Sequence, residues 1–207
     1  MVNPLNLAFA ILFYPTDAFV VIKRRYKEMS LWSSITIFLL MIVMRYITIL
    51  LTHRPLQQMD ISDTDLLLQI AVLVVPPLTY AVSSYGVTSV MQGETEFKCI
   101  FITTAYCYVP YLLLNPISIL ISRVLTLEES ALYNSITMIM NVWIILLLFV
   151  ALLQMNTYSF GKTIVVALLS IIGIVLIWIV LLLAFAFVFQ IVMFVRELLQ
   201  ELQIISV

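Results

Sequence analysis

The feature that most constrains this chain is a series of five long apolar runs separated by short polar segments. Each run reaches the ~20 residues that an α-helix needs to cross the ~30 Å hydrocarbon core of a bilayer. Backbone polar groups inside lipid must be paired within their own segment, so each run is expected to be a helix. The runs are Leu31–Thr52, Leu66–Met91, Cys99–Ser122, Leu132–Gln154 and Thr163–Val195. We therefore predict an all-α integral membrane protein with five transmembrane helices.

Composition leaves no material for a separate water-soluble domain. Hydrophobic residues make up 64% of the chain and charged residues 10%, against ~45–50% and ~25% in an ordinary soluble domain. The net charge of −1 lacks the basic excess that nucleic-acid binding requires. We expect the chain to contact membrane lipids and other membrane proteins, and no nucleic acid.

The N-terminal region has a character of its own. Leu5–Tyr14 is apolar but too short to span a bilayer, and a basic cluster follows at residues 23–27. This pattern predicts an interfacial amphipathic segment on the membrane surface, broken by Pro15 into two short helices. The predicted regions are an N-terminal interfacial segment (1–30), a five-helix membrane domain (31–195) and a short C-terminal tail (196–207).

The last apolar run is unusually long. Its 33 residues would form a helix of ~50 Å, well beyond the ~30 Å hydrocarbon core. No polar turn divides the run, so it is predicted to be one helix that tilts strongly or projects beyond the bilayer.

Lysine and arginine are distributed unevenly between the two predicted sides. The positive-inside rule favours a cytoplasmic N-terminus, and five spans then place the C-terminus outside the cell membrane. The inner side carries Lys23, Arg24, Arg25, Lys27, Lys98 and Lys162, and the outer side Arg54, Arg123 and Arg196.

Prolines fall inside two of the predicted spans. Pro76 and Pro77 lie in the middle of the second span, and Pro110 and Pro116 lie in the third. Each ring removes a backbone donor and clashes with the preceding turn, so both spans are expected to be broken. The freed carbonyls need donors inside the protein. Tyrosines near these breaks and Asn115 are candidates, Tyr106 among them. Small residues at Ala81, Ser84, Gly86 and Thr88 are expected to let another helix approach the second span.

Arg45 is the one charged residue well inside a predicted span. Placing an ionisable group there costs ~2.5–3.5 kcal/mol on insertion scales, so it is a functional candidate by default. It has two interpretations. The side chain could extend to the outer interface or bond to freed carbonyls, which is a structural role, or it could contact a substrate or lipid.

The sequence offers no recognisable catalytic set. His53 is the only histidine, and no Asp or Glu lies inside any predicted span, which argues against serine or cysteine hydrolase chemistry and against an intramembrane aspartyl pair. Gly161-Lys162-Thr163 lacks the first glycine of a phosphate-binding P-loop. We predict a non-enzymatic protein without a cofactor or metal.

Three short motifs carry a family resemblance. They are the turn Gly93-Glu94-Thr95-Glu96-Phe97-Lys98 followed by Ala105-Tyr106 and Pro110, the segment Tyr158-Ser159-Phe160-Gly161-Lys162-Thr163, and the lead-in Tyr14-Pro15-Thr16-Asp17-Ala18-Phe19. From about residue 12 to residue 195 the chain resembles the Yip (Ypt-interacting protein) family, in the compact form of its bacterial branch. The resemblance implies a five-helix membrane domain with a cytoplasmic N-terminus. It also implies an association with ABC-type sugar importers, which members of that branch often accompany.

Two functions fit these observations. The first is a membrane scaffold or accessory subunit that binds another integral membrane protein, such as the permeases of an ABC-type sugar importer. It would use the irregular second and third spans and the N-terminal segment. The alternative is a small transporter or channel with a site at the proline-broken helices, because discontinuous helices frame substrate sites in transporters. The candidate functional or packing residues are Arg45, Pro76, Pro77, Tyr106, Pro110 and Asn115.

Overall fold

The computed structural model describes the backbone of residues 4–52, 66–125 and 129–205, and the side chains of 6–52, 67–125 and 129–196. Over these residues the chain is helical, with short turns between the helices and no strand. The predicted all-α fold is confirmed. The helices are α1 (Pro4–Phe13), α2 (Pro15–Arg25), α3 (Leu31–Leu51), α4 (Leu66–Val90), α5 (Phe97–Cys107), α6 (Val109–Ser122), α7 (Ser130–Asn156) and α8 (Phe160–Ile205).

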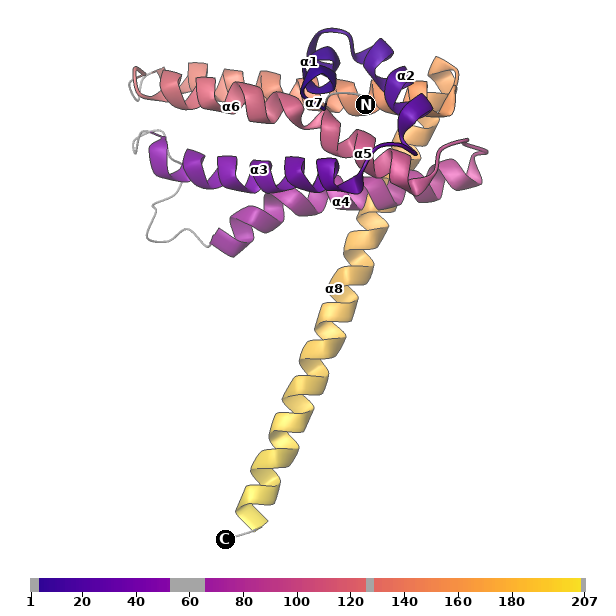
Figure 1. Cartoon of the computed structure of the whole chain (residues 1–207). Coiled ribbons are helices and arrows are strands. Elements are labelled where there is room, and N and C mark those ends of the chain that lie inside the picture. Colours follow the sequence, from indigo (N-terminus) through magenta and orange to yellow (C-terminus); the bar gives the residue numbers. More distant parts are fainter. Residues whose placement is uncertain (1–3, 53–65, 126–128, 206–207) are drawn as a thin grey trace.

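Five stretches of the described residues are long and apolar enough to cross a membrane, as predicted, and the chain is a multi-pass membrane protein. Four of them measure 21 to 27 residues, with α5 and α6 together forming the third, and the fifth lies in α8. In Figure 1, α3 runs between α4 and α6, and α6 runs beside α7. We call the end that contains turns 91–96 and 157–159 the hairpin end. At the opposite end α3 and α6 end, and α4 and α7 begin.

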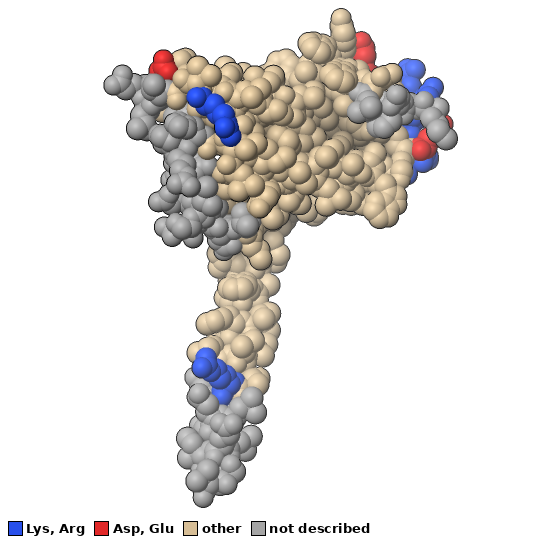
Figure 2. All heavy atoms as spheres, turned by 60° about the vertical axis from the view of Figure 1, so that its left-hand side comes forward, with Lys and Arg blue, Asp and Glu red and all other residues tan. Residues whose placement is uncertain are grey.

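Charged side chains gather toward the ends of the molecule, with the partly buried Arg45 as an exception. Figure 2 shows Lys, Arg, Asp and Glu gathered at the two ends of the bundle and near the described end of α8, with an uncharged belt between them on this face. Such a belt is the expected surface of a protein embedded in hydrocarbon.

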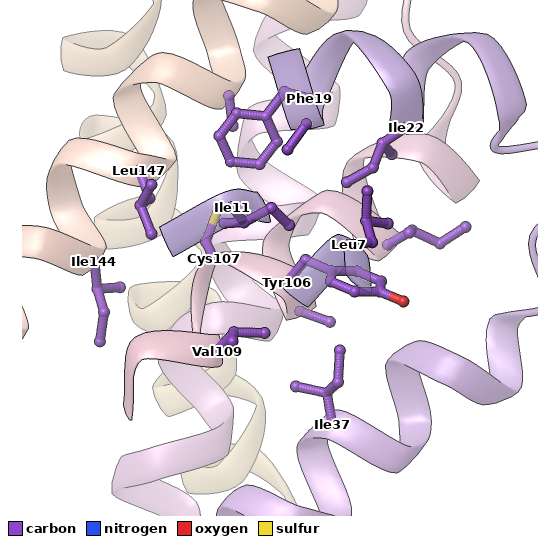
Figure 3. Packing of buried hydrophobic residues seen from close by; sticks show 14 of the residues in the cluster. Leu7, Ile11, Phe19, Ile22, Ile37, Tyr106, Cys107, Val109, Ile144 and Leu147 are labelled. Atoms are coloured by element: carbon purple, nitrogen blue, oxygen red, sulfur yellow. The ribbon is translucent and has the colours of Figure 1, made fainter. Parts of the chain in front are cut away.

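The N-terminal segment packs into the bundle. Tyr14 adopts a non-helical backbone (φ −133°, ψ 63°) between α1 and α2, so the predicted break at Pro15 is confirmed. Leu7 and Ile11 of α1, and Phe19 and Ile22 of α2, are buried with residues of α5 and α7 (Figure 3). This chain's own spans thus cover one apolar face of each helix, where the sequence suggested contact with lipid or a partner, whereas Phe9 and Phe13 of α1 remain exposed.

Helix α5 lies at the centre of the core. Its side chains are almost all buried from Cys99 to Cys107, because α3, α4, α7 and the two N-terminal helices surround it. Figure 3 shows the ring of Tyr106 among Leu7, Ile11 and Ile37. Burying such a ring removes a large apolar surface from its surroundings and fixes the neighbouring helices around it.

The two proline-containing spans behave differently. The third is interrupted at Tyr108 (φ −90°, ψ 2°), where α5 ends, and Pro110 lies in the first turn of α6, as Pro favours. In contrast, α4 stays helical through Pro76 and Pro77. The predicted break of the second span is therefore not observed. The Thr79 hydroxyl donates to the carbonyls of Val75 and Pro76 at 3.0 Å each, which supplies a side-chain donor beside the prolines.

Helix α8 leaves the bundle. It is one helix of 46 residues, in agreement with the single long helix predicted. Only its first part is buried, at Thr163, Val166 and Ser170. It stays beside α4 as far as Trp178, whose Nε1 donates to Thr79 Oγ1 at 3.5 Å. Further along it projects away from the other helices (Figure 1), and among residues 174–196 no side chain is buried. We call residues 174–196 the arm.

Candidate functional site inside the membrane domain

Arg45 lies on the inward face of α3. The buried residues of this helix recur every three or four positions, at Ser34, Phe38, Met41 and Thr48, which places them on one face. Arg45 falls on the same face, between Met41 and Thr48, and is partly buried. Its side chain is therefore directed toward α4 and α6, as is usual for an ionisable residue within a membrane span.

The guanidinium group of Arg45 is bonded to a neutral side chain. Its Nη2 donates a hydrogen bond to Oε1 of Gln69 on α4. The hydroxyl of Tyr111, from α6, lies beside Arg45 and Thr48. Residues from three helices thus meet around one positive charge. Gln69 lies in the first turn of α4, so the interpretation that Arg45 extends toward the interface stays a prediction.

A chain of hydrogen bonds continues from Thr48 into α6. Asn115 Nδ2 donates to Thr48 Oγ1 at 2.7 Å, and Thr48 Oγ1 donates to the carbonyl of Met44 at 2.7 Å. Ser118 Oγ lies 2.8 Å from the carbonyl and 3.1 Å from the side-chain oxygen of Asn115. All three side chains are buried. We call the set Arg45, Thr48, Gln69, Tyr111, Asn115 and Ser118 the polar cluster.

The polar cluster lies toward the opposite end of the bundle. Arg45 precedes the last residue of α3, Leu51, by six positions, which is ~9 Å along a helix. Buried hydrogen bonds in a low-dielectric interior hold their partners firmly, and a missing partner there is costly. The cluster therefore links α3, α4 and α6 and holds a positive charge between them.

Only two of the residues singled out from sequence meet in this cluster. Arg45 and Asn115 come together through Thr48. Tyr106 lies in the core near the N-terminal helices. The prolines shape the backbone: Pro77 and Pro110 are buried, whereas Pro76 is exposed. Sequence reasoning missed Thr48, Gln69 and Ser118, and it included Tyr111 only as one of the tyrosines near the proline breaks. Thr48 and Ser118 each lie one helical turn from Arg45 or Asn115, and that spacing could have identified them.

A second polar assembly ties α2 to the α4–α5 turn at the hairpin end. Lys23 Nζ lies 3.1 Å from Glu94 Oε2, and Lys27 Nζ lies 3.7 Å from Glu96 Oε1. Tyr26 donates its hydroxyl to Glu96 Oε1 at 2.7 Å. This hydrogen bond is the main reason why the pKa of Tyr26 is raised to about 12. The acidic residues of this turn thus hold the N-terminal segment in place.

The two turns of the hairpin end also lock together. Thr95 donates its hydroxyl to Oδ1 of Asn156 at 2.6 Å, and Tyr158 donates to the carbonyl of Met91 at 3.4 Å. A Cβ on Gly93 would lie 2.5 Å from Asn156 Oδ1 and 2.7 Å from the Tyr158 hydroxyl. Residues of two motifs that carry the family resemblance therefore meet in one contact that requires a glycine.

The small residues of α4 are used within the chain. Ser83 Oγ donates to the carbonyl of Ser170 at 2.7 Å, and Gly173 of α8 packs directly on Ser83. Ala81 and Ser84 are buried, whereas Gly86 has open space around it. A close helix approach on this span is observed at Ser83, which is not one of the four small residues named from the sequence, and the approaching helix is α8 of the same chain.

Comparison with known proteins agrees with the motifs and the fold. The model of the Yip1 domain family matches residues 9–183, from α1 into the arm and over more than four-fifths of the chain. Neither curated proteins nor solved structures gave a match. The matched range contains both turns of the hairpin end and the whole polar cluster. The chain therefore belongs to the Yip1 domain family.

Proposed function

We propose that this protein is a non-enzymatic membrane scaffold or accessory subunit that binds another integral membrane protein through the arm of α8. One observation carries the proposal. The apolar stretch of α8, Phe160–Arg196, is 37 residues long, and only 11% of its most apolar window is buried within the chain. The corresponding share in α3, α4 and α7 is 28%. The arm is thus the largest apolar element that the rest of the chain leaves uncovered.

The other surfaces suggested by the sequence are less suitable for a partner. The apolar faces of α1 and α2 pack on α5, α6 and α7. The small residues of α4 contact α8 at Ser83. A partner that used either surface would first have to displace this chain's own helices, and this would cost the burial that holds the bundle together.

Gln190 is the residue of the arm that can form a side-chain hydrogen bond with a specific partner helix. It is the only amide side chain in residues 174–196, which are otherwise almost entirely aliphatic or aromatic. A side-chain amide in hydrocarbon gains from a hydrogen bond to a neighbouring helix, by ~0.6–2 kcal/mol in measured cases. Its helical neighbours at three or four residues, Phe187 and Phe194, are also exposed, so the arm presents an exposed amide flanked by aromatic rings.

Co-purification tests this proposal. The tagged chain, purified from its native membrane in mild detergent, should retain an integral membrane protein. Gln190→Leu should reduce the retained amount several-fold, by ~1 kcal/mol of lost hydrogen bonding. Val188→Leu, on the other face of the same helix, is the matched control and should retain it in full. Equal retention by both variants, or no retained protein, would contradict the proposal.

The partner and the orientation are finer parts of the same proposal. The chain resembles compact bacterial members of the family, which often accompany ABC-type sugar importers, so a permease of such an importer is the first partner to test. Four basic residues lie at or beside the hairpin end. Lys23, Lys27 and Lys162 contact residues of its turns, and Lys98 donates to the backbone carbonyl of Lys27. The positive-inside rule then favours a hairpin end in the cytoplasm. A reporter fused at Val207 should be active only outside the cell membrane.

The polar cluster favours a second candidate, a small transporter. Arg45 and Tyr111 face one another between three helices, and polar groups at such depth mark substrate paths in membrane proteins. Purified protein in liposomes should then move an anionic solute unaided, and Arg45→Gln should abolish the flux. If uptake by the native protein does not exceed that of empty liposomes, this candidate fails.

A further inference from the structure

We propose that the polar cluster is a binding site for a phosphate-type anion, with Arg45 as its charged ligand and Tyr111 as a neutral donor. This inference does not rest on the scaffold proposal. A protein that only holds another membrane protein has no need for such a site, and the two proposals can fail separately.

The first observation is the charge balance around Arg45. Among the described residues, ion pairs form between Lys23 and Glu94 and between Lys27 and Glu96. Both are at the hairpin end, and the described partner of Arg45 is the neutral amide of Gln69. A guanidinium group has five N–H donors. Besides this amide oxygen, the Tyr111 hydroxyl lies within reach of the guanidinium group, and among the described residues no carboxylate pairs with its charge.

The second observation is the hydroxyl of Tyr111. This side chain is 7% exposed, and its oxygen has no hydrogen-bond partner of normal geometry in the described part of the chain. A buried polar group without a partner costs ~1–3 kcal/mol. Because it lies beside Arg45, a single ligand can reach both the hydroxyl and the guanidinium group.

The remaining members of the cluster determine the chemistry of this ligand. Thr48 Oγ1 already accepts from Asn115, and the Asn115 side-chain oxygen lies within hydrogen-bond distance of Ser118. Oxygens that could accept are thus engaged, whereas donors on Arg45 and Tyr111 are available. A site rich in donors with one positive charge selects an anion with several acceptor oxygens. The planar fork of Arg fits phosphate oxygens particularly well.

A membrane lipid or free phosphate could supply such a group, and the location of Arg45 is compatible with both. Arg45 is partly exposed and lies ~9 Å from the end of α3, so the phosphodiester of a membrane lipid at this interface is within its neighbourhood. Free phosphate entering from the same end offers the same oxygens. The experiment therefore uses both probes.

The test is a binding titration of the full chain, purified in a phosphate-free sugar detergent. The thermal unfolding midpoint is followed while dioleoylphosphatidylglycerol in mixed micelles, or inorganic phosphate at constant ionic strength, is added. Dioleoylglycerol, which has the same acyl chains and no phosphate, is the probe control. A concentration-dependent rise is expected with a phosphate-bearing probe and none with dioleoylglycerol, because binding to the native state alone stabilises it.

Variants identify the site. Arg45→Gln should raise the dissociation constant about tenfold or more, as expected when a charged hydrogen-bonding group is lost. Tyr111→Phe should raise it about threefold through loss of one neutral hydrogen bond. Arg123→Gln removes an equal charge from an exposed position at the same end and should leave the dissociation constant unchanged.

The results distinguish a lipid ligand, a soluble anion and the absence of a binding site. A response to the lipid alone supports a lipid phosphodiester as the ligand, and a response to inorganic phosphate supports a soluble oxyanion. Absence of any response, or equal affinities in Arg45→Gln and Arg123→Gln, would overturn the inference. If Arg45→Gln does not fold, Arg45→Lys and Tyr111→Phe take its place. Lysine keeps the charge but loses the fork, so native affinity in both of these variants would also overturn it.

Discussion

Gly93→Ala should loosen the contact between the two turns of the hairpin end. A Cβ at this position would lie 2.5 Å from Asn156 Oδ1, 2.7 Å from the Tyr158 hydroxyl and 2.9 Å from the carbonyl of Thr88. Two of these atoms belong to side chains held in place by hydrogen bonds, and the third is backbone. The turn must therefore move away from α7 to accept one methyl group.

The expected cost follows from these contacts. Forcing an extra carbon into a packed site costs ~1–3 kcal/mol. Moving the turn also stretches the 2.6 Å hydrogen bond from Thr95 to Asn156, which adds ~1 kcal/mol. We expect a total loss of about 2–4 kcal/mol and a clear fall in the thermal unfolding midpoint in detergent.

Gly86→Ala is the matched control. Gly86 is in the same helix that precedes the turn, and nothing lies within 4 Å of a Cβ placed there. Alanine favours a helix over glycine by ~1 kcal/mol, so this variant should unfold at an equal or higher temperature. If the two variants behave alike, the close approach at Gly93 is not what holds the turns together.

A second substitution, Tyr158→Phe, should relieve part of the clash in Gly93→Ala. Tyr158→Phe removes the hydroxyl that lies 2.7 Å from the new carbon. Combined with Gly93→Ala, it should cost less than the sum of the two single changes, because residues in contact do not act additively. If the stability losses of the two single variants add up to that of the double variant, the clash with the Tyr158 hydroxyl is not the cause of the loss in Gly93→Ala.

Three further outcomes are expected. Ile11→Ala, at a fully buried site of α1, should destabilise the purified protein by ~2–5 kcal/mol, whereas Phe9→Ala at an exposed site of the same helix should change the unfolding midpoint little. Ser83→Leu should separate α8 from α4, and a crosslink between cysteines placed on these helices should be lost, while Val82→Leu on the exposed side should preserve it. In an alkaline absorbance titration, a tyrosine with a pKa of about 12 should disappear in Tyr26→Phe. Because this pKa is raised above the ordinary value of 10.0, the Tyr26–Glu96 contact stabilises the fold fully below pH 10.0 and is lost as the pH rises through about 12.

The sequence predicted the number of spans and the long final helix, because both depend on the length of apolar runs alone. It also predicted the break at Pro15 and the interruption of the third span, which follow from local proline chemistry. It failed at Pro76 and Pro77, where α4 remains helical. A proline pair weakens a helix, but contacts with α5 and α8 can hold the segment helical, and such contacts are not visible in the sequence.

The candidate site was predictable in part for a similar reason. Arg45 stands out because a charge inside an apolar run is rare. Gln69 and Tyr111 do not stand out, since neutral polar residues occur in every span of this chain. Only the packing of α3 against α4 and α6 shows which of them face the charge. The same holds for the N-terminal segment. Its apolar residues are evident in the sequence, but the helices that bury them are known only from the structure.

The length of α8 has a consequence for the membrane around this protein. The predominantly apolar stretch Phe160–Arg196 has 37 residues and is ~55 Å long as a helix. To remain inside a flat hydrocarbon core of ~30 Å it must tilt by roughly 55–60°, beyond the 0–40° that is usual for transmembrane helices.

The first part of α8 is fixed to α4 by Ser83, Ser170 and Gly173, so the helix cannot adjust its direction freely. The bundle therefore sets the direction in which the arm leaves, and a flat bilayer accommodates that direction poorly. Either the bilayer deforms around the arm, at a cost for every ångström of mismatch, or a second membrane protein covers part of it. The scaffold proposal is the second case, and it gives a physical reason why a chain with a complete core should carry so long an uncovered helix.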